Sequence, residues 1–154
     1  MFAALIARLA LATLVLAAAA TADAETVFTG ALDGTLPATD SPATGFARLV
    51  LDDAQTEVAY EITYSGLLGE EFVAHIHAGD AGNFGQIVHM LPLGTPKIGV
   101  WEPTPRQLAG LLAEGVSVVI HTDLWPEGEI GGRVTAEQTP VARRTWSAVR
   151  ALLR

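Results

Sequence analysis

The stretch Glu57-Val58-Ala59-Tyr60-Glu61-Ile62-Thr63-Tyr64 decides the fold class, because a large apolar side chain occupies every second position. Side chains two residues apart point to the same face of a β-strand. One face of this segment therefore carries Val58, Tyr60, Ile62 and Tyr64. The pattern is typical of an antiparallel strand with one face buried and the other in water.

Six similar short runs lie around this stretch: Thr26–Leu32, Gly45–Leu51, Phe72–Ala78, Gln86–Leu91, Val116–Thr122 and Glu129–Ala136. Segments rich in proline, glycine and aspartate separate them, as expected for tight turns between strands. About seven to eight short antiparallel strands at this spacing predict an all-β protein, folded as a Greek-key β-sandwich or barrel.

One short helix is predicted between Thr104 and Gly115. Thr104 is a favourable N-cap, Pro105 a favourable first helical residue, and Gly115 stands where a left-handed C′ residue is common. The apolar stripe of this helix is formed by Leu108, Leu111 and Leu112. We expect the helix to cover one open end of the sandwich.

The chain ends differ in character from the β-rich body at residues 25–138. Residues 1–24 have one early arginine, an apolar run at Leu9–Ala20 and the small-x-small sequence Ala22-Asp23-Ala24. This pattern predicts a signal peptide cleaved near Ala24, so we expect an exported protein in the periplasm or outside the cell. The apolar run is shorter than the roughly 20 residues that a membrane-spanning helix needs.

Residues 139–154 form a basic tail. At helical spacing, one face carries Ala142, Trp146, Val149 and Leu153, and the opposite face carries Arg143, Ser147, Arg150 and Arg154. An amphipathic segment of this kind can lie on an anionic membrane, so peripheral membrane contact through Arg143–Arg154 is one prediction. A frayed tail, or one packed on the domain, is the alternative.

Composition narrows the possible partners and chemistry. Between Glu25 and Ala142 there are sixteen acidic residues and four basic ones, which argues against a nucleic-acid partner. There is no cysteine for a disulfide or a thiolate ligand, and no serine has the sequence context of an activated nucleophile. We therefore favour a binding module over an enzyme.

The histidines are the candidate site. His75 and His77 are two apart in one predicted strand, and His121 lies in another. In each strand the neighbouring residues form an apolar face that we expect to be buried: Phe72, Ala74, Ile76 and Ala78 in the first strand, and Val116, Val118 and Ile120 in the second. We therefore expect the imidazoles to share the face that points away from the core. If the strands are adjacent, the three rings form a surface metal site for copper or zinc.

Two questions stay open at this point. The same three imidazoles could instead be architectural, each bonding a turn carbonyl or an acid such as Asp80, Asp123, Glu127 or Glu129. His89 shares its strand face with Ile87 and Leu91, so it is a less favoured fourth ligand. The ligand set predicted here is His75, His77 and His121.

The sequence resembles the CHRD domain, named from chordin and found in many exported bacterial proteins. Three features occur in the family's order: Ala74-His75-Ile76-His77, then His121-Thr122, then Pro126-x-Gly128-Glu129-Ile130-x-Gly132. Thr29-Gly30-Ala31-Leu32 and Pro42-Ala43-Thr44-Gly45-Phe46-Ala47 are similar to the domain's beginning. The resemblance covers Thr26 to Ala136. It implies an extracellular or periplasmic β domain with a protein partner, since chordin is an extracellular protein that binds growth factors; a metal partner is predicted by the histidines alone.

A weaker resemblance is to copper-zinc superoxide dismutase, which also places copper histidines on a His-x-His strand and a later Val-x-His strand. It implies that His75, His77 and His121 would match three of the four copper histidines, and that copper redox chemistry is an alternative function. The cysteine pair of that family is absent, and its zinc ligands have no clear counterpart.

Overall fold

The computed structural model describes residues 25–79 and 84–137. This part of the chain is all-β, as predicted, with eight antiparallel strands and one short helix, α1 (Pro105–Leu112). The strands are β1 (Thr26–Leu32), β2 (Thr44–Leu51), β3 (Val58–Ser65), β4 (Glu71–Ala78), β5 (Gln86–Leu91), β6 (Lys97–Trp101), β7 (Val116–Thr122) and β8 (Ile130–Ala136).

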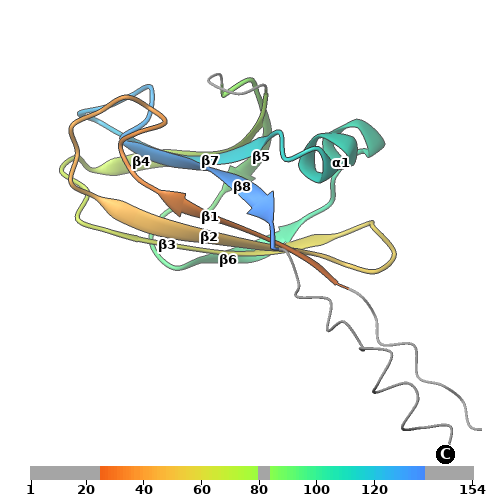
Figure 1. The fold of residues 1–154 in the computed structure, drawn as a ribbon. Helices are drawn as coiled ribbons and strands as arrows, with labels where there is room; N and C mark the ends of the chain where they lie inside the picture. The colour runs from red at the N-terminus through yellow and green to blue at the C-terminus, as the bar shows by residue number, and fades with distance from the viewer. Residues whose placement is uncertain (1–24, 80–83, 138–154) are drawn as a thin grey trace, which may run out of the picture.

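The strands form one nearly closed, barrel-like sheet in the order β5-β4-β7-β8-β1-β2-β3-β6. Figure 1 shows it folded into two layers, with β5, β4, β7 and β8 above β1, β2, β3 and β6. Strands distant in sequence are neighbours, since β4 pairs with β7 and β1 pairs with β8. The predicted sandwich or barrel is therefore confirmed.

The core lies between the two layers, and β3 contributes the face that the sequence predicts. Val58, Tyr60 and Ile62 are buried, and Tyr64 packs against the same cluster. The alternate residues of β3, Ala59, Glu61 and Thr63, are exposed. Burial of this apolar face contributes roughly 25 cal/mol per Å² removed from water.

The two layers meet where β1 crosses β8, and glycine permits that contact. A Cβ atom on Gly132 would lie 1.9 Å from the carbonyl oxygen of Ala31. A Cβ atom on Gly30 would lie 2.3 Å from the carbonyl oxygen of Arg133. Any side chain at these positions would force the strands apart, so the corner of the fold depends on both glycines.

One core prediction is wrong. Phe72 was expected beside Ala74 and Ile76 in the buried face of β4, but its side chain is 51% exposed. The pairing register of β4 with β7 shifts between Glu71 and Val73, and an irregularity of this kind reverses which side a residue faces. Phe72 instead lies near His121, with ring centroids 6.4 Å apart.

The helix begins as predicted and ends differently. Thr104 is the N-cap and forms a capping box with Gln107. The C-cap is Ala113, and the left-handed residue after it is Glu114, with φ of 56°, where Gly115 was predicted. Of the predicted leucine stripe, Leu111 is fully buried in the core and Leu112 is 47% exposed.

Strand β6 was not predicted, because Lys97 and Gly99 interrupt its apolar pattern. Lys97 is nonetheless fully buried. Its ammonium group donates to the carboxylate of Glu71 and to the carbonyl oxygens of Pro92 and Gly94. The Tyr64 hydroxyl donates to the same carboxylate, so β3, β4 and β6 are joined by one ionic cluster.

The predicted signal peptide (1–24) and basic tail (139–154) lie outside the described residues. Within the described ranges, no helix has the length and hydrophobicity needed to cross a membrane.

Candidate metal centre

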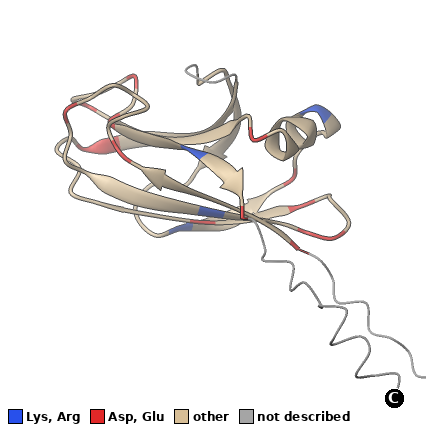
Figure 2. Cartoon of the chain, viewed as in Figure 1, with Lys and Arg blue, Asp and Glu red and all other residues tan. Residues whose placement is uncertain are grey.

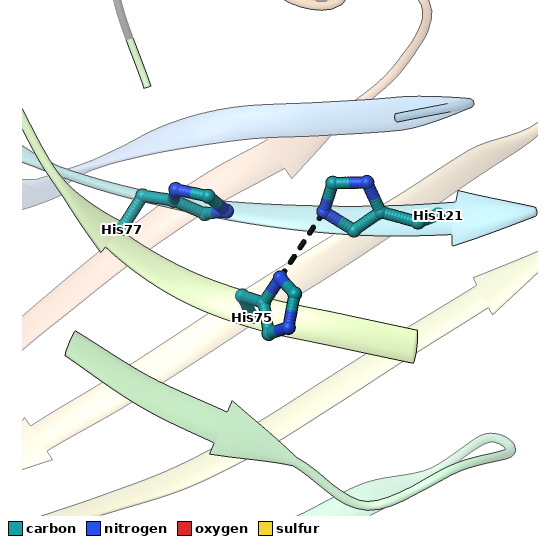
Figure 3. A group of neighbouring side chains, drawn as sticks. All are labelled: His75, His77 and His121. Carbon is teal, nitrogen blue, oxygen red and sulfur yellow. Dashed lines mark hydrogen bonds between the residues drawn. The ribbon is translucent and has the colours of Figure 1, made fainter. Parts of the chain in front are cut away.

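The three predicted ligands come together. His75 and His77 extend from β4 and His121 from the adjacent strand β7, all on the face that points away from the core (Figure 3). One nitrogen from each ring can be chosen so that the three lie within 4.8 Å of one another. Among the described residues, this is the one group of histidines and acids close enough to hold a metal ion.

The site is buried, whereas the sequence predicted a surface position. The exposed fractions of His75, His77 and His121 are 8%, 6% and 7%. The alternation of side chains along each strand correctly placed the rings outside the core, but loops cover that face of the sheet. A Cβ atom on Gly128 would touch Val119 of β7, Pro37 and Phe84, which places three loops over the strand.

The contact between His75 and His121 has the spacing of two ligands on one ion. His75 Nδ1 and His121 Nε2 are 3.3 Å apart, marked by the dashed line in Figure 3. Two nitrogens bound at about 2.0–2.1 Å to one tetrahedral metal are separated by about 3.3 Å. These two nitrogens are therefore already at the separation that a shared ion would need.

The tautomer of His121 follows from its partners. Its Nδ1 atom is 2.9 Å from the carbonyl oxygen of Pro126, which can only accept, so Nδ1 carries the proton and donates. In the neutral ring the Nε2 lone pair then accepts a hydrogen bond from His75 Nδ1. A backbone carbonyl that fixes the ring in this way is a common support for a metal-binding histidine.

His77 completes the cluster without a comparable anchor. Neither of its buried ring nitrogens has a hydrogen-bond partner of good geometry among the described residues. The backbone of Gly85 lies close enough to favour the protonated ring electrostatically. Buried polar atoms without partners are costly, and a bound ion would satisfy one of them.

Burial keeps two of the rings neutral. It lowers the pKa of His75 below 6.5, and the neighbouring rings of His121 and His77 lower it further. Burial also lowers the pKa of His77, in opposition to the Gly85 backbone, with a smaller contribution from His121. A metal binds neutral imidazole, so this environment favours the binding-competent form near neutral pH.

His89 is not part of the cluster. His89 lies in β5 and is the cross-strand partner of Ile76 in β4, which is a core residue. It therefore lies on the opposite face of the sheet from His75 and His77. Its ring contacts Tyr60 at 5.5 Å and stacks on Trp101 at 6.2 Å between centroids. Its surroundings are therefore those of a core residue.

Of the acids that might have held the imidazoles, Glu129 and Asp123 have other roles, and Asp80 lies outside the described residues. Glu129 is fully buried, and its carboxylate accepts hydrogen bonds from the Ser41 and Thr122 hydroxyls and the Leu68 and Gly69 backbone N–H groups. Burial alone would raise the pKa of Glu129, but these four bonds lower it below 4.5. Asp123 accepts from the Glu70 backbone N–H.

Glu129 thus has a structural role, whereas the sequence suggested it only as one possible partner of the imidazoles. Its carboxylate joins three separate segments, and its own carbonyl oxygen accepts from Thr39. It fixes the turn that carries Pro126, and so supports His121 indirectly. The signal was present in the sequence, where Glu129 stands between Gly128 and Ile130 with no basic residue beside it.

Comparison with known families agrees with this architecture. Residues 20–134, well over half of the chain, match the CHRD domain. The chain belongs to the CHRD domain family. The match contains both histidine motifs and the whole Gly-Glu-Ile-x-Gly segment, Gly128–Gly132, beside the loops that cover them. No curated protein matches the chain, so the resemblance to copper-zinc superoxide dismutase stays a prediction.

Proposed function

We propose that this CHRD-domain protein is an exported binding module that holds one Cu(II) or Zn(II) ion through His75, His77 and His121. The observation that carries the proposal is the convergence of three buried imidazoles, with two facing nitrogens 3.3 Å apart. The predicted signal peptide supports export. Nitrogen ligands without thiolate suit both ions, and divalent copper is generally the stronger binder.

The chemistry of the cluster supports a metal over a purely polar contact. A hydrogen bond between His75 and His121 uses one nitrogen of each ring and leaves His77 unsatisfied. A metal would engage all three rings. With three protein ligands, a tetrahedral ion keeps one open position, which is the arrangement of a site that exchanges a small ligand.

An architectural role is the second candidate, and the bond from His121 to Pro126 favours it. In that case the histidines hold the covering turn and no ion is required. Copper redox chemistry is a further alternative. It would need a copper ion at the three histidines, with the reacting molecule at the open coordination position of that ion. Metal binding is therefore the property to measure first.

The test is titration of the metal-free protein with Cu(II) and with Zn(II), followed by isothermal calorimetry and metal analysis after desalting. We expect about one equivalent bound by wild type and loss of at least tenfold in affinity in His77→Ala. His77→Ala removes no well-formed hydrogen bond, so the variant should stay folded. His89→Ala is the matched control, since it removes an imidazole from the other face.

The proposal fails if wild type binds no ion, or if His77→Ala and His89→Ala bind equally well. If metal binding fails in this way and His121→Ala loses much of the protein's stability, the architectural role is supported instead.

We also propose peripheral membrane contact for the basic tail. Its test is binding to anionic vesicles that high salt and truncation after Pro140 both abolish.

A further inference from the structure

The shape of the histidine cluster restricts which ions it suits. The ring centroids are 5.4 Å apart for His75 and His77, 5.0 Å for His75 and His121, and 6.0 Å for His77 and His121, so the rings form a nearly equilateral triangle (Figure 3). Cu(II) prefers a square set of ligands, and any three corners of a square include two that are opposite, about 1.4 times as far apart as neighbours. The three separations here differ by only about a fifth, which suits a trigonal or tetrahedral ion instead.

The walls of the site are neutral. The phenyl ring of Phe84 lies 5.6 Å from the ring of His77 between centroids, and the phenyl ring of Phe72 lies 6.4 Å from the ring of His121. On the paired strands β4 and β7, the cross-strand partners of the three histidines also carry no charge: Val73, Ser117 and Val119. Walls of this kind do little to offset the charge of a buried ion.

The described carboxylates do not supply that charge either. Figure 2 shows the acids scattered over loops and both layers. Close to the site in sequence, Glu129 and Asp123 accept hydrogen bonds from other groups, and Glu127 is exposed. Burial, the neighbouring rings and one backbone group shift the pKa values of His75 and His77, and no described carboxylate contributes.

Both features favour the reduced form of copper. An ion of charge +2 costs more to bury than one of charge +1, because the desolvation penalty rises steeply with charge. Cu(I) has a filled d shell, like Zn(II), and so has no preference for a square arrangement. We propose that this site binds Cu(I) more tightly than Cu(II). The inference rests on the metal site proposed above. A tenfold preference for Cu(I) raises the reduction potential of this one-electron couple by about 59 mV.

The test compares the two oxidation states on the metal-free protein. Cu(I), kept reduced by ascorbate under argon, is titrated in competition with bicinchoninate. Cu(II) is titrated in competition with glycine, and Zn(II) is titrated alongside. We expect the dissociation constant for Cu(I) to be at least about tenfold below that for Cu(II).

Three variants test the part played by charge. Phe72→Glu places a carboxylate beside His121 at a side chain that is already exposed, so the variant should fold. It should strengthen Cu(II) binding relative to Cu(I) by about fivefold, which lowers the reduction potential by about 40 mV. Phe72→Gln removes the same ring without adding charge. Phe46→Glu adds the charge on β2, at a phenylalanine about as exposed as Phe72. Both controls should leave the ratio of the two dissociation constants unchanged.

The inference is overturned if Cu(II) binds as tightly as Cu(I), or if Phe72→Glu has the same ratio of dissociation constants as wild type. Zn(II) distinguishes this failure from failure of the site itself. If Zn(II) binds near one equivalent and Cu(I) is not preferred over Cu(II), the metal site stands and the inference falls. If none of the three ions binds, both fall.

Discussion

Replacing Glu129 by glutamine should destabilise the domain more than its small chemical change suggests. In the folded protein one carboxylate oxygen accepts from the Ser41 hydroxyl and the Leu68 N–H, and the other from the Gly69 N–H and the Thr122 hydroxyl. Glutamine keeps only one of these oxygens. Its amide group must therefore face one of the two backbone N–H groups.

The magnitude follows from which donors can adapt. A hydroxyl can rotate to accept from the new amide, but a backbone N–H cannot. One buried donor is left without a partner, and such a group costs about 1–3 kcal/mol. We expect Glu129→Gln to lower the free energy of unfolding by about 2 kcal/mol. Glu129→Ala should lower it by at least about 3 kcal/mol, because all four donors lose their acceptor.

The assay is equilibrium unfolding in urea at pH 7, followed by tryptophan fluorescence. The matched control is Glu127→Gln, an exposed residue two positions away, which should change stability by less than about 0.5 kcal/mol. Equal stability losses in Glu129→Gln and Glu127→Gln would refute the reasoning.

The pH dependence provides a second check. The folded pKa of Glu129 lies below 4.5, so its contribution is full above that value and is lost as the pH falls through the folded pKa. The stability difference between wild type and Glu129→Gln should therefore shrink on acidification below about pH 5. A constant difference down to pH 3 would show that the carboxylate charge is not what the four donors recognise.

Three further predictions concern other parts of the fold. Lys97→Met should cost about 3–5 kcal/mol in urea unfolding because it leaves the Glu71 carboxylate buried without its cation, and Lys97→Met/Glu71→Gln should recover part of that loss. Gly132→Ala should lower stability by about 3 kcal/mol or prevent folding, since its Cβ atom would lie 1.9 Å from a facing carbonyl oxygen; a urea midpoint equal to that of wild type would contradict this. His75 and His77 have folded pKa values below 6.5, so on acidification the unfolded chain takes up protons before the folded protein does. In the absence of metal, the melting temperature should therefore fall as the pH drops below about 6.5. That fall should be smaller in His77→Ala, measured by calorimetry from pH 8 to pH 5.

Strand periodicity was sufficient to predict most of this fold. The bounds of β1, β5 and β7 agree with the sequence prediction, because each is a run of β-forming residues closed by turn residues. Strand β6 could not be recognised, since its inward position is a lysine whose charge is matched by Glu71, a residue 26 positions away. Long-range ionic pairing of this kind leaves no local pattern.

The candidate site could also be predicted only in part from the sequence. The i, i+2 spacing of His75 and His77 placed both imidazoles on one face, and that local rule held. Their burial depends on loops that reach over β7 from distant parts of the chain, which no periodicity describes. The reversal of Phe72 has a similar cause, because a register shift between paired strands is set by the partner strand.

The burial of Lys97 has a practical consequence for labelling. It is the chain's only lysine, it is fully buried, and its ammonium group is engaged by three oxygen atoms. Amine-reactive dyes, biotin esters and cross-linkers should therefore modify the folded protein at its amino terminus alone. Acylation of Lys97 requires local opening, so its rate, read by mass spectrometry, would report how often this part of the sheet unfolds.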